Sequence, residues 1–267
     1  MQPEIDVLGF SLKTFGLCFG IAFLVSGAIT TRRLKELGRP PDWAYEMVFA
    51  ALLGGLIGAR GYWLLGHTDE LADDVLGSVF GGSGLVFYGG LVGGAVGVAL
   101  WARRRGVLNL ELLDLCAPGL AMGYAVGRIG CQISGDGDYG SPTDLPWGMA
   151  YPDGIVPTTE VVHPTPIYET LSMALVAWAL WRARDAFRPG VLFACYLVLA
   201  GTERLLVEFV RRNEPVLAGL TEAQIASLVM LIAGVVWLMR AARHRGLRIA
   251  GSAPAAPSAS VSAPTSS

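Results

Sequence analysis

The chain has 267 residues, of which 53% are hydrophobic and only 16% are charged, and its formal net charge is −2 at pH 7. Soluble domains contain about 25% charged residues, so this composition excludes an ordinary soluble domain and indicates a polytopic membrane protein. The 35 glycines fit this class, because glycine lets membrane helices approach closely. The net charge says nothing about partners until charges are assigned to sides of a membrane, and no nucleic-acid partner is expected.

Seven apolar segments are each predicted to form a transmembrane helix, since a bilayer core about 30 Å thick needs about 20 apolar residues of helix. In chain order they cover about 10–30, 45–65, 85–102, 112–131, 167–181, 190–209 and 222–240. The fifth segment is short, so its helix is expected to include flanking residues. No cluster of positive charge and no small-residue cleavage site precedes the first segment, which favours a retained span over a cleaved signal peptide.

The distribution of lysine and arginine predicts that the N-terminus is outside and the C-terminus in the cytoplasm. Most basic residues follow the first, third, fifth and seventh segments, and short cytoplasmic loops are enriched in such residues. The predicted fold class is an all-α membrane protein with seven transmembrane helices, residues 1–248, and a small extracytoplasmic head at about 132–166. Residues 249–267 are rich in Ala, Pro and Ser and are predicted to be a disordered cytoplasmic tail.

Three arginines lie inside predicted spans, namely Arg60, Arg128 and Arg204. An ionisable group inside a membrane costs at least a few kcal/mol, so it usually faces a polar cavity or a partner. One interpretation is that these arginines only snorkel or pair with structural acids. The candidates for such pairing are Glu46, Glu203 and Glu208.

The other interpretation is an anion site with an internal counter-charge. Arg204, Glu208 and Arg211 recur at helical spacing, so they share one face of an otherwise apolar helix. Two arginines can hold a phosphate through charge-assisted, often bidentate hydrogen bonds. In a membrane the abundant phosphate is the lipid headgroup, so Arg128 and Arg204 are candidate lipid-binding residues.

Two further clusters lie near the predicted outer surface. The stretch HPTPIYE, 163–169, brings a histidine, a tyrosine and a glutamate together, and GLVFYGGLVGG, 84–94, places Tyr88 among glycines. Each cluster also has a purely structural interpretation. His163 would be a loop histidine with an ordinary hydrogen bond, the glycines would allow close helix packing, and Tyr88 would be an aromatic anchor at the membrane interface.

The sequence indicates neither a metal nor a cofactor. The four cysteines fit neither a zinc site nor a disulfide framework. The stretch GDGDYG, 135–140, matches a dinucleotide-binding pattern, but no strand precedes it and its aspartates would repel a pyrophosphate. It also begins like a calcium loop, but Gly140 replaces a ligand and Ser141 replaces the turn glycine.

Five blocks in their order and spacing resemble the bacterial prolipoprotein diacylglyceryl transferase family, and the resemblance covers nearly the whole chain. The blocks are GLVFYGGLVGG, DLCAP (114–118), GRIGCQISGDGDYG (127–140), HPTPIYE and ERLLVEFVR (203–211). The resemblance implies a seven-helix enzyme of the bacterial cytoplasmic membrane, with the N-terminus outside. It implies transfer of the diacylglyceryl group of phosphatidylglycerol to the lipobox cysteine thiol of preprolipoproteins, the first step of lipoprotein maturation. The implied partners are phosphatidylglycerol, these signal peptides and membrane lipids.

Carried over residue by residue, the resemblance implies both catalytic and phosphatidylglycerol-binding residues. The catalytic residues would be Arg128, Arg204, Tyr88, Glu208 and Glu169. The lipid-binding residues would be Arg128, Arg204, Ser134, Asp136, Gly140, His163, Tyr168 and Arg211. Asp114 matches an acid at the start of the family's signature helix.

The sequence also departs from the family's pattern. Many members have a histidine where this chain has Tyr88, and Cys131, Ser134 and Asp136 replace signature residues. Tyr88 is a poor base at its usual pKa of about 10, so it is expected to orient the substrate, and Glu169, Glu208 or His163 remain alternatives for the base. The second hypothesis is a non-catalytic protein of the same fold that binds or transports lipid headgroups.

Overall fold

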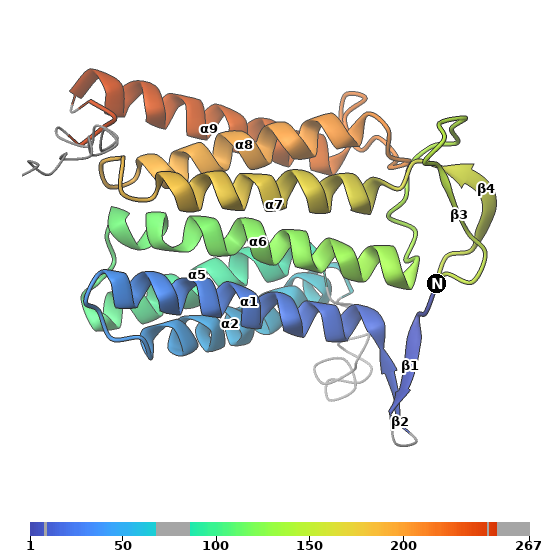
Figure 1. The fold of residues 1–267 in the computed structure, drawn as a ribbon, viewed down its shortest axis with the longest axis horizontal. Coiled ribbons are helices and arrows are strands. Elements are labelled where there is room, and N and C mark those ends of the chain that lie inside the picture. Colours follow the sequence, from blue (N-terminus) through green and yellow to red (C-terminus); the bar gives the residue numbers. More distant parts are fainter. Residues whose placement is uncertain (8–9, 68–85, 245, 250–267) are drawn as a thin grey trace, which may run out of the picture.

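The computed structural model describes residues 1–7, 10–67, 86–244 and 246–249, and in these ranges it is a bundle of seven helices with two small β-hairpins (Figure 1). The helices are α1 (Thr14–Glu36), α2 (Trp43–Gly66), α5 (Phe87–Arg105), α6 (Leu110–Ser134), α7 (Thr165–Ala183), α8 (Val191–Glu208) and α9 (Glu222–His244). Antiparallel pairs are formed by β1 (Glu4–Val7) with β2 (Phe10–Lys13), and by β3 (Met149–Tyr151) with β4 (Thr158–Val162). The predicted mostly helical class is confirmed, whereas neither hairpin was predicted.

Four of these helices, α1, α2, α6 and α9, are long and apolar enough to cross a membrane. The shorter helices α5, α7 and α8 have 19, 19 and 18 residues and are not among these four. A helical membrane protein therefore fits the structure, and the crossing of the membrane by all seven helices stays a prediction. The predicted tail, 249–267, lies outside the described residues except for Ile249.

Helices α2 and α5 pack with their backbones in contact through glycines. A Cβ atom added to Gly58 would lie 2.7 Å from the Cα atom of Gly93, and one added to Gly93 would lie 2.8 Å from the Cα atom of Gly58. Side-chain carbons essentially never approach other atoms this closely. The close-packing interpretation of the glycines in 84–94 is therefore confirmed for Gly93.

We expect Gly58→Ala to destabilise the protein by about 1–3 kcal/mol, because the added methyl group forces the two backbones apart. The matched control is Gly61→Ala on the same helix, where nothing in the described part of the chain lies within 4 Å of the added carbon. The free energy of unfolding in mixed micelles measures the difference. Equal stability of the two variants would contradict the tight α2–α5 contact.

Helix α6 runs through the bundle and carries small residues toward its neighbours. Ala117, Ala121 and Ala125 are buried against α7 and α8, and Gly130 packs against Cys18 of α1. The helix begins at Asn109, whose side chain accepts a hydrogen bond from the Leu112 N–H at 3.0 Å. Gly135, directly after the last helical residue Ser134, adopts the left-handed conformation at φ 58°, and the chain then leaves the bundle.

Asp114 joins α6 to the beginning of α8. Its carboxylate accepts hydrogen bonds from the backbone N–H groups of Gly190 and Phe193, both at 2.7 Å. These N–H groups have no partner within their own helix, so the Asp114 carboxylate acts as the N-terminal cap of α8 from a neighbouring helix.

The Asp114→Ala variant is expected to lose about 1–2 kcal/mol of stability, the usual cost of removing a capping carboxylate. Asp42→Ala is the control, because Asp42 precedes α2 without capping it through its side chain. Thermal unfolding of the two variants in detergent should show a lower midpoint for Asp114→Ala alone. An unchanged midpoint would mean that water replaces the carboxylate at no cost.

The segment between α6 and α7 forms a small head at one end of the bundle, beside the N-terminus (Figure 1). Tyr139, Tyr151 and Val162 form its buried core. A backbone bridge between Gly140 and Arg211 links the head to the chain after α8, with the Ser141 N–H donating to the Val210 carbonyl at 2.7 Å. The end of α6, the beginning of α7 and the end of α8 therefore meet beneath the head.

Candidate functional site

Three arginines and three carboxylates gather where these three helices meet the head. We call this group the arginine–carboxylate cluster. Its members are Arg128 of α6, Asp138 of the following loop, Glu169 of α7, Arg204 and Glu208 of α8, and Arg211 just beyond α8.

Glu169 lies at the centre of the cluster, and its side chain is fully buried. Its Oε2 atom is 3.4 Å from both Arg128 Nε and Arg211 Nη1. Its Oε1 atom is 3.6 Å from Arg204 Nη1 and accepts a hydrogen bond from the Tyr124 hydroxyl at 2.6 Å. One buried carboxylate thus contacts all three arginines, which explains how they are tolerated inside an apolar bundle.

Glu208 is a second buried counter-charge. Its Oε2 atom lies 2.9 Å from Arg204 Nη1 and 3.8 Å from Arg211 Nε. Its Oε1 atom accepts hydrogen bonds from Asn213 at 2.7 Å and from the Thr221 hydroxyl at 2.6 Å. Oε1 is therefore hydrogen-bonded, whereas Oε2 meets the two arginines through charge contacts without a hydrogen bond among the described residues.

Asp138 bridges two of the arginines from the head side. One carboxylate oxygen pairs with Arg128 and the other with Arg211. Burial alone would raise the pKa of Asp138, but the two guanidinium groups outweigh this effect and lower it. Burial, together with the nearby charge of Asp138, raises the pKa of Asp136. Asp138 is thus held ionised between the two cations.

The sequence predicted five of the six cluster residues as site residues, all except Asp138, and it did not predict the supporting hydroxyl of Tyr124. Tyr124 precedes Arg128 by one helical turn and accepts a hydrogen bond from its Nη2 at 3.0 Å. The four-residue spacing could have indicated this contact. Nothing in the sequence distinguishes Asp138 from Asp136 as the arginine partner.

The structure places His163 and Tyr168 in a second polar group at the junction of the head and α7. The Tyr168 hydroxyl accepts a hydrogen bond from the Trp147 ring N–H at 2.8 Å and lies 3.3 Å from His163 Nδ1. Gly140 lies between the His163 and Val210 backbones, and a Cβ atom there would come within 2.9 Å of the His163 side chain. These residues shape the head beside the cluster.

Ser134 and Tyr88 take different positions. Ser134 is fully buried, and its hydroxyl donates to the Cys131 carbonyl within α6 at 3.3 Å. Tyr88, at the beginning of α5, interacts electrostatically with Arg204, Glu208 and Glu222. Tyr88 is therefore within electrostatic range of the α8 residues of the cluster, whereas Ser134 supports the end of α6.

Arg60, the remaining arginine in a predicted span, lies on α2. Its guanidinium carbon lies 4.4 Å from the centre of the Trp63 ring in the same helix, and the residue is buried. A cation over an aromatic face is a common structural arrangement. Of the three arginines in predicted spans, Arg128 and Arg204 therefore share Glu169, and Arg60 packs on an aromatic ring of its own helix.

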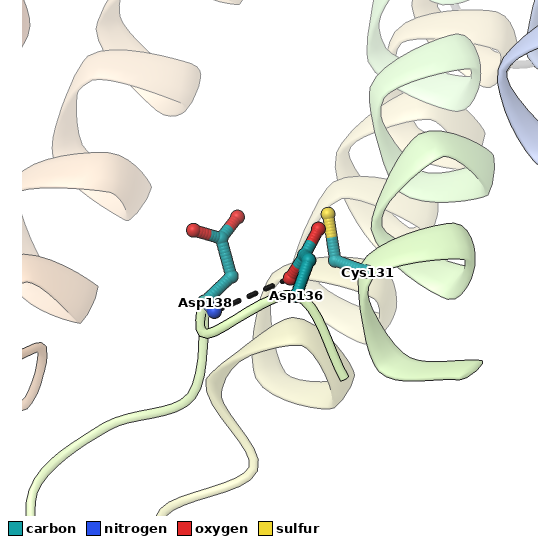
Figure 2. A group of neighbouring side chains, drawn as sticks. All are labelled: Cys131, Asp136 and Asp138. Atoms are coloured by element: carbon teal, nitrogen blue, oxygen red, sulfur yellow. Dashed lines mark hydrogen bonds between the residues drawn. The ribbon is translucent and has the colours of Figure 1, made fainter. Parts of the chain in front are cut away.

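Cys131, Asp136 and Asp138 form a group whose ligand atoms lie within 4.8 Å of one another (Figure 2). The Asp138 N–H donates to Asp136 Oδ1 at 3.2 Å. A cation at this point would face the guanidinium of Arg128, which lies 3.7 Å from the Cys131 sulfur, and would compete with arginines for both Asp138 oxygens. The group is therefore better described as the rim of the arginine–carboxylate cluster than as a metal site.

The bundle and the cluster define a class of protein, namely a polytopic membrane protein whose helices hold paired arginines beneath a small head. The family model for prolipoprotein diacylglyceryl transferases matches residues 3–240. The chain belongs to this family of enzymes.

Two relatives illustrate the similarity. A phosphatidylglycerol–prolipoprotein diacylglyceryl transferase of Chromohalobacter salexigens is 34% identical over 258 residues, which cover 89% of this chain and 94% of the relative. The enzyme of the same name from Clostridium tetani is 30% identical over 241 residues, covering 88% of this chain and 96% of the relative. The resemblance inferred from the five blocks is thereby confirmed.

Proposed function

We propose that this protein transfers the diacylglyceryl group of phosphatidylglycerol to the cysteine thiol of prolipoproteins. The names of its relatives support this activity. The structural observation that carries the proposal is the convergence of Arg128 and Arg204, from two different helices, on one fully buried carboxylate. Such fixed guanidinium groups suit the binding of a lipid phosphate.

In this reaction the cysteine sulfur forms a bond to the glyceryl carbon, and the bond between that carbon and the phosphate oxygen breaks. The phosphate leaves as glycerol phosphate, and negative charge grows on the leaving oxygen. Arg128 and Arg204 stabilise that charge, because preorganised cations in a water-poor site act most strongly where charge develops. Their contacts to Glu169 and Glu208 keep both guanidinium groups in place before the lipid binds.

The attacking sulfur must be a thiolate, because the thiol itself is a weak nucleophile. The arginines lower the pKa of a thiol placed beside them, since a nearby cation favours the charged form. Tyr88, which is within electrostatic range of Arg204, orients the substrates. Glu169 and Glu208 act as the counter-charges that make the arginine site possible. The proton of the thiol is transferred to water.

We further propose a bacterial cytoplasmic membrane location, with the N-terminus and the head outside and the C-terminus in the cytoplasm. The end of the bundle opposite the head carries the basic helix ends of α1, α5, α7 and α9 (Figure 1). Basic residues mark the cytoplasmic side of membrane proteins. With this orientation the cluster lies at the end of the bundle that faces the outer leaflet, where the lipobox peptide arrives.

The test is mass spectrometry of a lipobox peptide incubated with the purified protein and phosphatidylglycerol. The wild type should add a diacylglyceryl mass, and Arg128→Ala and Arg204→Ala should not. Arg212→Ala is the control, because Arg212 pairs with Glu160 at the surface of the head. A folded wild type that binds the lipid but gives no mass shift would favour the alternative, a protein that binds or transports lipid headgroups.

A further inference from the structure

We infer that Asp138 is a built-in competitor of the lipid phosphate, whose carboxylate occupies Arg128 and Arg211 until a phosphate group replaces it. This inference rests on the proposed function, since it concerns the phosphate held at Arg128, and it adds Arg211 as a further group that binds this phosphate. It assigns Asp138 a role in controlling when the phosphate site is open.

The contacts of Asp138 reproduce those expected of a bound phosphate. Its two oxygens reach one guanidinium on α6 and another beyond the end of α8. Carboxylates and phosphates are recognised by arginine in the same way, through N–H groups directed at two oxygens of an anion. A phosphate that bridges Arg128 and Arg211 therefore needs the positions that the Asp138 oxygens fill.

Among the three cluster acids, Asp138 is the one suited to leave. Its side chain is 31% exposed, whereas those of Glu169 and Glu208 are fully buried. Neutral donors also anchor the two glutamates, Tyr124 at Glu169 and Thr221 at Glu208. A displaced Asp138 carboxylate reaches water, while a displaced glutamate would lose its hydrogen bonds inside the bundle.

The exchange requires only a rotation of the Asp138 side chain. Its backbone is fixed by the Thr165 hydroxyl, which donates to the Asp138 carbonyl at 2.5 Å, and by its own N–H bond to Asp136. The carboxylate can therefore rotate toward solvent without movement of the head, and it stays close enough to return.

The charges favour replacement over addition. Three arginines balance the three carboxylates of the cluster, and a phosphodiester, which carries one negative charge, replaces Asp138 without changing this balance. A phosphate that entered beside Asp138 would leave one uncompensated buried charge, which is costly. The product is a phosphomonoester with a charge of about −1.5 to −2 at pH 7, so its excess charge and the returning carboxylate both favour its release.

The test uses the full chain in detergent and glycerol 1-phosphate as the probe, with the affinity measured by titration calorimetry. Asp138→Asn should bind the probe about tenfold more tightly than the wild type, since the arginines are then always open. The control Asp144→Asn removes an exposed charge of the same head and should bind like the wild type. Inorganic phosphate, as a second probe, shows whether the site needs the glycerol part.

Unchanged or weaker binding by folded Asp138→Asn would overturn the inference and make Asp138 a fixed support of the arginines. Asp138→Ser is the second neutral variant, and failure of both variants to fold would overturn it equally. The kinetic signature in the peptide assay is a lower KM for phosphatidylglycerol together with a lower kcat, because product release slows. Binding needs no turnover, so an inactive wild type that still shows the Asp138→Asn effect would refute the proposed transfer but retain the exchange.

Discussion

Replacing Arg128 by lysine is expected to reduce diacylglyceryl transfer by about 10²–10³-fold, the usual cost of removing a preorganised donor to a developing negative charge. Arg128 contacts three groups through three nitrogens. Nη1 pairs with Asp138, Nη2 donates to the Tyr124 hydroxyl at 3.0 Å, and Nε lies 3.4 Å from Glu169. A lysine ammonium is a compact charge and cannot reproduce this planar set of directions.

The measurement is kcat/KM for a lipobox peptide in phosphatidylglycerol micelles. Arg212→Lys is the matched control, because its guanidinium contacts Glu160 at the surface of the head, and it should keep near wild-type activity. Thermal unfolding of both variants separates a catalytic loss from an unfolded protein. An Arg128→Lys enzyme within about threefold of the wild type would be inconsistent with a directional role for Arg128 in stabilising the leaving phosphate.

Changing Glu169 to glutamine is expected to destabilise the protein by about 3–5 kcal/mol, the cost of breaking a buried ion pair by removing one partner. The Glu169 carboxylate lies within 3.6 Å of a nitrogen from each of Arg128, Arg204 and Arg211. A neutral amide of the same shape leaves these three cations with two counter-charges. The amide would also direct an N–H group at an arginine or at the Tyr124 hydroxyl.

This effect is read from the free energy of unfolding in mixed micelles that lack anionic lipid, since a bound phosphate would supply the missing charge. Glu160→Gln is the control, because Glu160 is exposed and pairs only with Arg212 among the ion pairs of the described ranges. A Glu169→Gln protein as stable as the control would mean that the arginines are compensated by groups other than Glu169.

The hydropathy of the sequence predicted where each helix lies along the chain, but it did not predict the residues at which the helices begin and end. The short fifth segment, 167–181, becomes α7 from Thr165 to Ala183, as expected from its apolar centre. The first segment was predicted to begin near residue 10, but Phe10–Lys13 forms β2 and α1 begins at Thr14. Phe10–Lys13 alternates apolar and polar residues, as a strand does, but it runs directly into the apolar start of α1. Four residues are too short a stretch to separate a strand from the first turn of a helix by pattern.

The part of the site that lies on one helix was predictable, because helical spacing places Arg204, Glu208 and Arg211 on one face. Their mutual contacts confirm that they belong together. The position of Glu169 among all three arginines depends on how α6, α7 and α8 pack, which no local pattern contains. The choice of Asp138 depends on the turn at Gly137, where φ is 96°.

The sharing of Glu169 by three arginines also has a consequence for biosynthesis. A chain is made from its N-terminus, so Arg128 enters the membrane before its later partners exist. Asp138, ten residues on, supplies the first counter-charge, and Glu169 follows on the next helix. Arg204 and Arg211 arrive after these acids are in place, and Arg204 brings Glu208 with it one turn later. In the proposed arrangement, with all seven helices in the membrane, each cation of the cluster reaches the bilayer with an acid already present or close behind. This order avoids an insertion intermediate with several unpaired arginines.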